Sequence, residues 1–308
     1  MEDRRLLLIL NPCAGQRRAN RVLPEILRAL LDEGYRCETY ITAASGDATR
    51  YAAAHAAEFD RIVCAGGDGT LNETIAGVLA SGAGVPIGYI PCGTTNDYAS
   101  SIGLSSDVLQ AARDAVGGEP HRLDVGLFNG RYFTYTASCG AFTRASYSTP
   151  QPLKNSLGHL AYILEGIKDL PSLRSYHLRV ETEETTLEDN FLFCSITNST
   201  SVGGILKLDS QMVALNDGLF EVMLVRSPVT PIQLSTIIHG LTTLNLPNEM
   251  VHFFSAKDIR VTSAEPLEWT LDGERAEGGT EAVLHNLHSA VEIVTPAKPA
   301  PSEGEEAP

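Results

Sequence analysis

A glycine-rich segment in the first third of the chain combines residue types that could bind a phosphate. Gly66-Gly67-Asp68-Gly69-Thr70 follows an apolar run over residues 61–64 and precedes apolar residues at helical spacing. Glycines let the backbone approach a ligand closely, and the first N–H groups of the following helix can bind an anion. Because Asp68 would repel a phosphate directly, we expect it to meet a nucleotide through Mg²⁺.

The same segment could instead be a tight turn that ends in a helix cap. It is not a Walker A loop, because no Gly-Lys-Ser/Thr follows. It also departs from the dinucleotide fingerprint, because Asn72 stands where the third glycine belongs.

Two further apolar runs end in small and polar residues. The predicted strand over residues 5–10 ends at Asn11-Pro12 and is followed by Gly15, and the predicted strand over residues 85–90 ends in a segment that contains Thr94, Asn96 and Asp97. Parallel strands bring such loops to one edge of a sheet, where open α/β sheets bind ligands. We therefore expect an amide and a second carboxylate near Asp68. The alternatives are a simple strand end at Asn11 and a helix cap at Asn96-Asp97.

Taken together, these segments resemble the catalytic domain of the diacylglycerol kinase family. The likeness rests on GGDGTLNE, on residues 11–15 (NPCAG) and on residues 91–99 (PCGTTNDYA), and it continues through residues 208–220 and 272–274. It is greatest toward the soluble bacterial diacylglycerol kinases and related bacterial lipid kinases. The resemblance implies an enzyme that uses ATP and Mg²⁺ to phosphorylate a lipid hydroxyl, with diacylglycerol as the leading acceptor.

The resemblance also implies roles for individual residues. Asp68 and Asp97 would align the triphosphate through Mg²⁺, and Glu274 would accept the proton of the lipid hydroxyl. The residues implied to line the nucleotide are Asn11, Gly15, Thr42, Gly66, Gly67, Asp68, Gly69, Thr70, Leu71, Asn72, Thr94 and Asn96. A structural Mg²⁺ would take the Asp217 carboxylate and the backbone carbonyls of Ala214 and Leu219.

The residue types alone leave other interpretations open. Thr42 could be a strand-end hydroxyl, Asp217-Gly218 a hairpin turn, and Glu274 a solvated residue after a turn. The chain has Asn216 where relatives often have a second Asp. Gln16 and Glu165 stand where relatives can carry lysine, for which Arg17, Arg18 and Arg21 could compensate.

The pattern of elements predicts an α/β class fold joined to a β domain. Residues 1–123 alternate strands and helices, which indicates a doubly wound, mainly parallel nucleotide-binding domain. Short β-branched and aromatic runs dominate residues 124–289, which indicates a β-sandwich lipid-substrate domain. By the family pattern a strand near residues 290–296 returns to the first domain, and the active site lies in the cleft. The Pro- and Glu-rich residues 297–308 should be a disordered tail.

Composition limits the class of partner. A net charge of −15 argues against nucleic acid and against general adhesion to anionic membranes. The six cysteines show no CxxC pair, and the first apolar run is too short for a signal peptide or a membrane span. We expect a cytoplasmic protein without a transmembrane segment, associated peripherally with the inner face of the membrane where its lipid substrate lies.

Two other functions remain open. NAD kinases share GGDGT and the two-domain plan, although their downstream motif for the ribose has no convincing copy here. A catalytically silent regulator that binds nucleotide or lipid would also fit the altered basic positions. The motifs do not distinguish diacylglycerol from sphingoid bases or phosphatidylglycerol, and a homodimer is an open expectation because relatives can dimerise.

Overall fold

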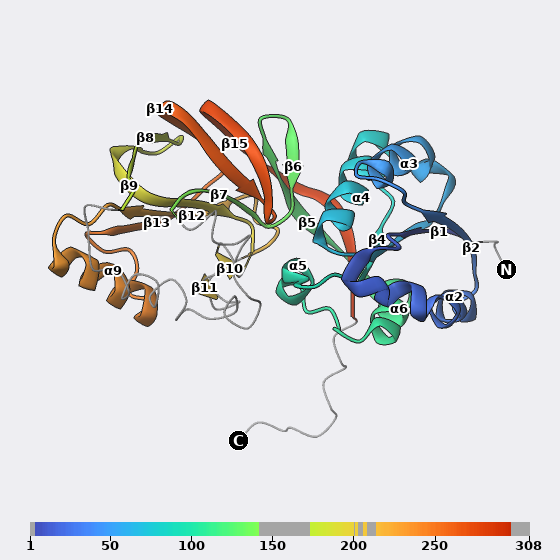
Figure 1. The fold of residues 1–308 in the computed structure, drawn as a ribbon. Coiled ribbons are helices and arrows are strands. Elements are labelled where there is room, and N and C mark those ends of the chain that lie inside the picture. Colours follow the sequence, from blue (N-terminus) through green and yellow to red (C-terminus); the bar gives the residue numbers. More distant parts are fainter. Residues whose placement is uncertain (1–3, 142–172, 200, 203–205, 208–213, 297–308) are drawn as a thin grey trace, which may run out of the picture. The chain divides into compact units, whose positions relative to one another are not determined.

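The computed structural model describes residues 4–141, 173–199, 201–202, 206–207 and 214–296 (Figure 1). The chain divides into two compact units. Unit 1 comprises residues 1–122 and 291–308, and unit 2 comprises residues 123–290. Apolar residues at helical spacing predict a helix over residues 156–170. That segment, which includes Glu165, and the predicted tail lie outside the described residues.

Unit 1 is built on a parallel sheet. Its strands are β1 (Arg4–Leu10), β2 (Tyr35–Ile41), β3 (Arg61–Gly66) and β4 (Ile87–Pro91), in the order β4-β3-β1-β2. Every residue of β3 and β4 is buried, as expected for parallel strands that are covered on both faces. The end of the long strand β15 (Glu274–Thr295) adds a further parallel neighbour, with Ile293 opposite Ile87 of β4.

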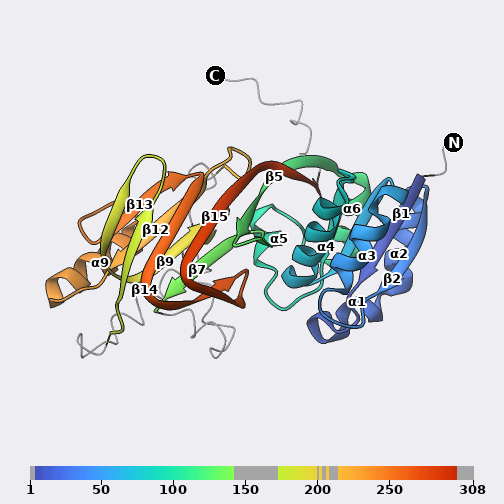
Figure 2. The ribbon, with the colours of Figure 1, turned by 90° about the horizontal axis from the view of Figure 1, so that it is seen from above.

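Helices cover both faces of this sheet (Figures 1 and 2). On one face lie α2 (Leu23–Asp32) and α6 (Val108–Gly117), and on the other α3 (Asp47–His55) and α4 (Asp68–Ser81). The helices α3 and α4 pack closely because α4 has a glycine at the contact: a Cβ built on Gly77 would lie 2.6 Å from the Cβ of Ala52. Shorter elements are η1 (Ala14–Arg17), α1 (Arg18–Arg21), η2 (Ala56–Glu58) and α5 (Asp97–Ser101).

The segment after β1 is more broken than its apolar spacing predicts. Residues 18–31 have the pattern of one helix, but the structure has α1 and then α2, separated at Val22. Pro24 lies in the first turn of α2, where its missing N–H costs nothing. In the middle of a longer helix the same proline would break the hydrogen-bond ladder, so the helix restarts there.

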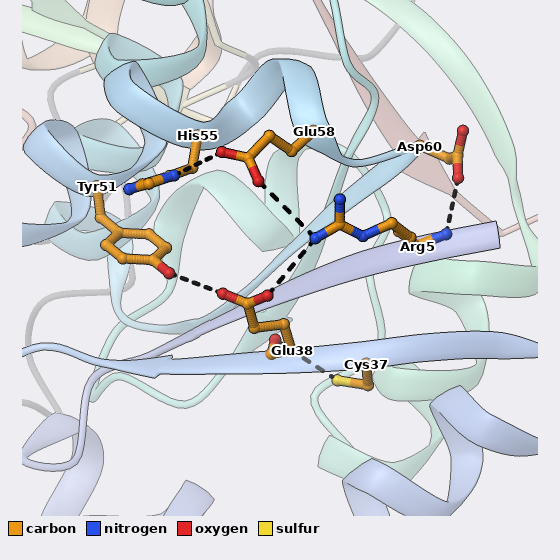
Figure 3. A network of polar contacts seen from close by, with 7 residues as sticks. All are labelled: Arg5, Cys37, Glu38, Tyr51, His55, Glu58 and Asp60. Atoms are coloured by element: carbon orange, nitrogen blue, oxygen red, sulfur yellow. Dashed lines mark hydrogen bonds and ion pairs between the residues drawn. The ribbon is translucent and has the colours of Figure 1, made fainter. Parts of the chain in front are cut away.

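A polar network joins the strands β1 and β2 to the helix α3 (Figure 3). The Arg5 guanidinium lies 3.7 Å from a carboxylate oxygen of Glu38 and 3.8 Å from one of Glu58. Tyr51 donates to Glu38 at 2.8 Å, and His55 lies 2.7 Å from Glu58. These groups are largely exposed, so each pair contributes at most about 1 kcal/mol; together they orient α3 against β2.

Unit 2 consists mainly of antiparallel strands. They are β7 (Thr136–Gly140), β8 (Tyr176–Glu181), β9 (Thr186–Thr197), β12 (Phe220–Arg226), β13 (Val251–Ala256), β14 (Asp258–Leu271) and most of β15. Both β9 and β14 pair first with β8 and then with β7, so each long strand passes from one partner to another. Apolar runs over residues 259–262 and 267–271 predict two strands, but the structure has one strand, β14, with register shifts between the two runs.

Aromatic side chains fill the core of unit 2. Phe128 packs against Trp269 with ring centroids 5.0 Å apart, and Phe133 stacks on Phe220 at 5.5 Å. The remaining described elements are β5 (Glu119–Phe128), β6 (Arg131–Phe133), β10 (Ser201–Val202), β11 (Leu206–Lys207) and α9 (Pro231–Thr243). None of the helices in the described residues has both the length and the apolar character that a membrane crossing requires.

Candidate active site

The carboxyl ends of the strands of unit 1 are joined by backbone hydrogen bonds that continue beyond the strands. The N–H of Asn11 donates to the carbonyl of Ala65 at 2.9 Å, and the N–H of Cys92 donates to that of Gly66 at 2.7 Å. The N–H of Thr42 likewise donates to the carbonyl of Leu10 at 2.9 Å. The loops that carry the predicted nucleotide residues therefore start side by side at one edge of the sheet.

Asp68 is the first residue of α4 and does not lie in a loop before it. Gly67 is the N-cap in an extended conformation, and its carbonyl accepts from the N–H groups of Thr70 at 3.0 Å and Leu71 at 3.1 Å. Gly69, Thr70, Leu71 and Asn72 are helical as well. A carboxylate in the first turn of a helix is stabilised by the helix dipole.

The Asp68 carboxylate is 8% exposed and bonded within the protein. One oxygen accepts from the Tyr89 hydroxyl at 3.3 Å, and the other accepts from the backbone N–H of Asp97 at 3.0 Å. The structure therefore brings Asp68 and Asp97 together as expected from the parallel strands. Because protein donors already satisfy Asp68, its burial does not by itself require a cation.

Tyr89 is a residue of this edge that the sequence analysis missed. Its hydroxyl lies 3.3 Å from Asp68 and 3.4 Å from the side-chain oxygen of Asn96, and its single proton can be donated to one of them at a time. Burial, and then the charge of Asp68, raise the pKa of the Tyr89 hydroxyl well above its usual range. Tyr89 thus stays a neutral donor. In the sequence, Tyr89 differs from its neighbours only in carrying a hydroxyl within an otherwise apolar strand, and this hydroxyl is the one indication of a polar role.

Glycines allow the loops of this edge to touch. Gly15 has φ 49°, and a Cβ built on it would lie 1.8 Å from the carbonyl oxygen of Cys92. A Cβ on Gly66 would lie 2.6 Å from the Thr70 side chain, whose hydroxyl accepts from the Asn11 amide at 3.0 Å. The loops after β1 and β4 and the start of α4 therefore pack backbone against backbone.

The other predicted nucleotide residues differ in their surroundings. The Thr42 hydroxyl lies 3.4 Å from the carbonyl of Leu10, while Thr94 is exposed. Asn96 has φ 51° and donates to the carbonyl of Gly93 at 3.0 Å. Among the candidate compensating arginines, Arg18 donates to the carbonyl of Ser106 at 3.1 Å.

Glu274 lies in unit 2, directly after a turn that Asp272 holds. The buried Asp272 carboxylate accepts from the N–H groups of Thr134 at 2.6 Å, Tyr135 at 2.9 Å and Thr136 at 3.0 Å. Desolvation raises the pKa of Asp272, and these hydrogen bonds oppose the rise. Glu274 itself is exposed, and its Oε2 lies 2.7 Å from the Arg131 guanidinium.

The predicted structural metal site lies in a turn that a second buried carboxylate holds. The Asp217 side chain accepts from the N–H of Leu219 at 3.0 Å. Asp124, which is fully buried, accepts from the N–H groups of Gly218 at 2.7 Å and Ser289 at 2.6 Å. Sequence reasoning missed Asp124, because nothing near residue 124 indicates partners so distant along the chain.

A third acid near this turn, Glu221, has one carboxylate oxygen without a hydrogen bond within the described residues. The residue is 3% exposed, and the oxygen is Oε2. Burial, followed by the charges of Asp217 and Asp124, raises the pKa of Glu221 to about 8. No group of three His, Cys, Asp or Glu side chains in the described residues could hold a metal. A site made of the Asp217 carboxylate and the carbonyls of Ala214 and Leu219 needs no such group, and its oxygen ligands and surplus negative charge fit a hard cation.

Comparisons with known proteins agree with the fold. Residues 5–128 match the family model of the diacylglycerol kinase catalytic domain, and residues 137–295 match that of the YegS C-terminal NAD kinase beta sandwich-like domain. A crystal structure of a diacylglycerol kinase from Bacillus anthracis str. Sterne has the same fold, with a TM-score of 0.73 at 20% identity, over 97% of this chain and 98% of that chain.

Curated relatives are similar over nearly their whole length. A diacylglycerol kinase of Bacillus subtilis (strain 168) is 33% identical over 96% of this chain and 98% of its own. A diacylglycerol kinase of Staphylococcus epidermidis is 33% identical over 95% of this chain and 92% of its own. The predicted family and the predicted two-domain kinase fold are thus confirmed, and the chain belongs to the diacylglycerol kinase family and is a kinase.

Proposed function

We propose that this protein is a lipid kinase that transfers the γ-phosphoryl group of ATP to the hydroxyl of diacylglycerol, which gives phosphatidic acid. The observation that carries the proposal is the arrangement around Asp68. In a chain of this family, a buried carboxylate sits at the head of α4, bonded to Tyr89 and to the backbone of Asp97, beside the ends of β1 and β4.

In this mechanism, unit 1 binds and orients ATP. The amino-terminal end of α4 directs its dipole and backbone N–H groups toward phosphate oxygens, and Gly15, Gly66 and Gly67 let the backbone approach them. Asp68 and Asp97 would hold the Mg²⁺ that accompanies ATP. When bound, this ion neutralises charge on the phosphates and lowers the barrier to transfer.

Unit 2 supplies the base and the structural cation site. The lipid oxygen forms a bond to the γ-phosphorus, the bond from that phosphorus to the bridging oxygen of ADP breaks, and the hydroxyl proton passes to Glu274. Asp272 holds the turn before Glu274 and so fixes its backbone. Asp217, with the carbonyls of Ala214 and Leu219, would bind the structural Mg²⁺.

An acceptor panel tests this proposal. Purified protein is incubated with γ-labelled ATP and diacylglycerol, a sphingoid base or phosphatidylglycerol in mixed micelles, and products are detected by mass. We expect phosphatidic acid as the main product and its loss in Glu274→Gln. Removal of a general base costs on the order of 10²–10⁴ in rate. The matched control is Glu277→Gln, an exposed glutamate on the same strand, which should behave as wild type.

A second candidate, NAD kinase activity, is favoured by the sandwich-like domain match alone. Addition of NAD to the same assay distinguishes lipid kinase activity from NAD kinase activity. Formation of NADP without phosphatidic acid would show that NAD, and not diacylglycerol, is the acceptor. Tight ATP binding without transfer to any acceptor would favour a silent regulator.

The lipid acceptor also implies where the protein works. We propose peripheral association with the inner face of the cytoplasmic membrane. Co-sedimentation with vesicles of neutral and anionic lipid tests it, and the net charge of −15 makes general electrostatic adhesion to anionic lipid unfavourable. A homodimer stays a proposal that light scattering can test.

A further inference from the structure

The ion pair between Arg131 and Glu274 joins two strands of unit 2 at the residue assigned as the base. Arg131 Nη2 lies 2.7 Å from Glu274 Oε2, and Arg131 Nη1 lies 3.4 Å from the carbonyl of Arg275. The guanidinium therefore contacts both the side chain of Glu274 and the backbone that follows it. Within the described residues, the second carboxylate oxygen of Glu274, Oε1, accepts no hydrogen bond.

The backbone that carries Arg131 is fixed independently of this pair. Arg131 follows the turn Asn129-Gly130, whose residues have φ 46° and φ 84° and connect β5 to β6. The Asn129 side chain accepts from the N–H of Val283 at 2.8 Å and donates to the carbonyl of Glu281 at 3.3 Å. These bonds hold the β5–β6 hairpin to β15, the strand that begins with Glu274.

The backbone that carries Glu274 is fixed as well. Asp272 and Gly273 form the turn between β14 and β15, and the Asp272 carboxylate binds three consecutive N–H groups of residues 134–136. Those residues follow directly after β6. Both residues of the ion pair thus follow turns that hydrogen bonds hold in place. The position of the Glu274 carboxylate then depends on the rotamer of its side chain.

We propose that Arg131 is the positioning residue for Glu274, binding Oε2 so that Oε1 is presented to the lipid hydroxyl. This inference rests on the proposed function. An exposed glutamate with three rotatable bonds would otherwise sample many orientations, and misplacing a reacting group by about 1 Å can cost 10²-fold in rate. Arg131 side-chain exposure is 48% and that of Glu274 is 62%, so the pair contributes little to folding. The hydroxyl proton goes to Oε1 as the new O–P bond forms, while Oε2 keeps its bond to the guanidinium.

The test compares Arg131→Gln with the loss of a second exposed ion pair that also involves β15. Arg275 Nη2 lies 2.8 Å from Glu268 Oε1, across β14 and β15, with side-chain exposures of 67% and 44%. Steady-state kinetics with diacylglycerol should show kcat lowered about 10- to 100-fold in Arg131→Gln, with KM for ATP within about twofold. Arg275→Gln should keep wild-type kcat, Arg131→Lys should recover part of the loss, and both glutamine variants should keep the wild-type melting temperature.

A double mutant separates positioning from an independent role. If Arg131 acts only through Glu274, Arg131→Gln lowers kcat in the wild-type background and has no further effect in the Glu274→Gln background. Multiplicative effects in the double mutant, or wild-type kcat in Arg131→Gln, would overturn the inference while Glu274 remained the base. Wild-type kcat in Glu274→Gln would overturn the base assignment itself, and no transfer to any acceptor would overturn both proposals.

Discussion

The buried carboxylate of Asp68 depends on donors from two other elements, the strand β4 and the helix α5. Residues 96–97 lie near it, as the parallel arrangement of the strands predicts, and the backbone N–H of Asp97 donates to it at 3.0 Å. The role of Tyr89 could not be predicted, because a tyrosine inside an apolar strand gives no sign in the sequence of where its hydroxyl points. The assignment of these residues to nucleotide binding stays a prediction.

Tyr89→Phe tests this donor. The change removes a hydroxyl bonded to a buried carboxylate and keeps the ring, so we expect a loss of about 1–3 kcal/mol in the free energy of unfolding and weaker binding of ATP with Mg²⁺. Denaturant unfolding and calorimetric titration measure the two effects. Tyr40→Phe is the control, since its ring stacks on Tyr51 and that contact survives. Equal stability and affinity in Tyr89→Phe and wild type would contradict this account.

Gly15→Ala tests the contact between loops. A Cβ at this position would meet the Cys92 carbonyl at 1.8 Å, so the loops after β1 and β4 must separate. Gly84→Ala is matched to it, because Gly84 also has a positive φ, 62°, but nothing lies within 4 Å of its Cβ position. Both changes cost about 1–2 kcal/mol in backbone strain, and only Gly15→Ala should also abolish ATP binding. Similar ATP affinities in the two variants would show that the loop contact is unimportant.

At the scale of elements, the spacing of apolar residues predicted the positions of helices and strands. It was less successful for the points at which these elements are interrupted. Apolar residues at helical spacing predict a helix over residues 107–116, and the structure has α6 there, capped by Asp107, which accepts from the N–H of Gln110. The spacing did not resolve the break between α1 and α2, nor the fusion of two predicted strands into β14. These features depend on a proline at a helix start and on pairing with distant strands, which apolar spacing does not record.

The start of α3 has a pH dependence that follows from Asp47. The Asp47 carboxylate accepts from the N–H groups of Ala43 at 2.7 Å and Ala44 at 2.8 Å, and these bonds lower the pKa of Asp47 below its ordinary value of 3.8. A lowered pKa in the folded state means stability that is present above pH 3.8 and is lost as the pH falls through the folded-state value. Wild type should therefore lose stability relative to Asp47→Asn as the pH falls from 5 to about 2.

Unfolding curves measured by circular dichroism across this pH range show whether the stability difference between wild type and Asp47→Asn shrinks as the pH falls. Asp32→Asn is a suitable control, because Asp32 is exposed and forms an ion pair with Arg28 one helical turn earlier. A gap between wild type and Asp47→Asn that stays constant, or grows toward low pH, would contradict the assignment.

For the molecule as a whole, the contrast between a parallel half and an antiparallel half could be predicted, since it follows from alternating elements in one half and short strands in the other. The contacts that hold Glu274 and the turn over residues 214–219 could not be predicted from the sequence. Asp124 binds Ser289, which lies 165 positions away, and Arg131 binds Glu274, which lies 143 positions away. A single sequence gives no local sign of such pairs.

Ile293→Ala tests how much unit 1 depends on the end of β15. Ile293 is fully buried opposite Ile87 of β4, so its truncation should cost about 2–5 kcal/mol and reduce ATP binding at the temperature where unit 1 begins to unfold. Thr280→Ala, at an exposed position of the same strand, is the control. Denaturant unfolding of both variants measures the loss in the free energy of unfolding. A smaller loss in Ile293→Ala than in Thr280→Ala would show that unit 1 does not depend on the end of β15.

The return of β15 to β4 also has a consequence for biosynthesis. On the ribosome, residues 1–122 emerge first, and one border of β4 then lacks its hydrogen-bonding neighbour until residues 291–295 have been made. Unit 1 of a nascent chain therefore has an unpaired strand edge for most of translation, and such an edge can pair wrongly with other chains.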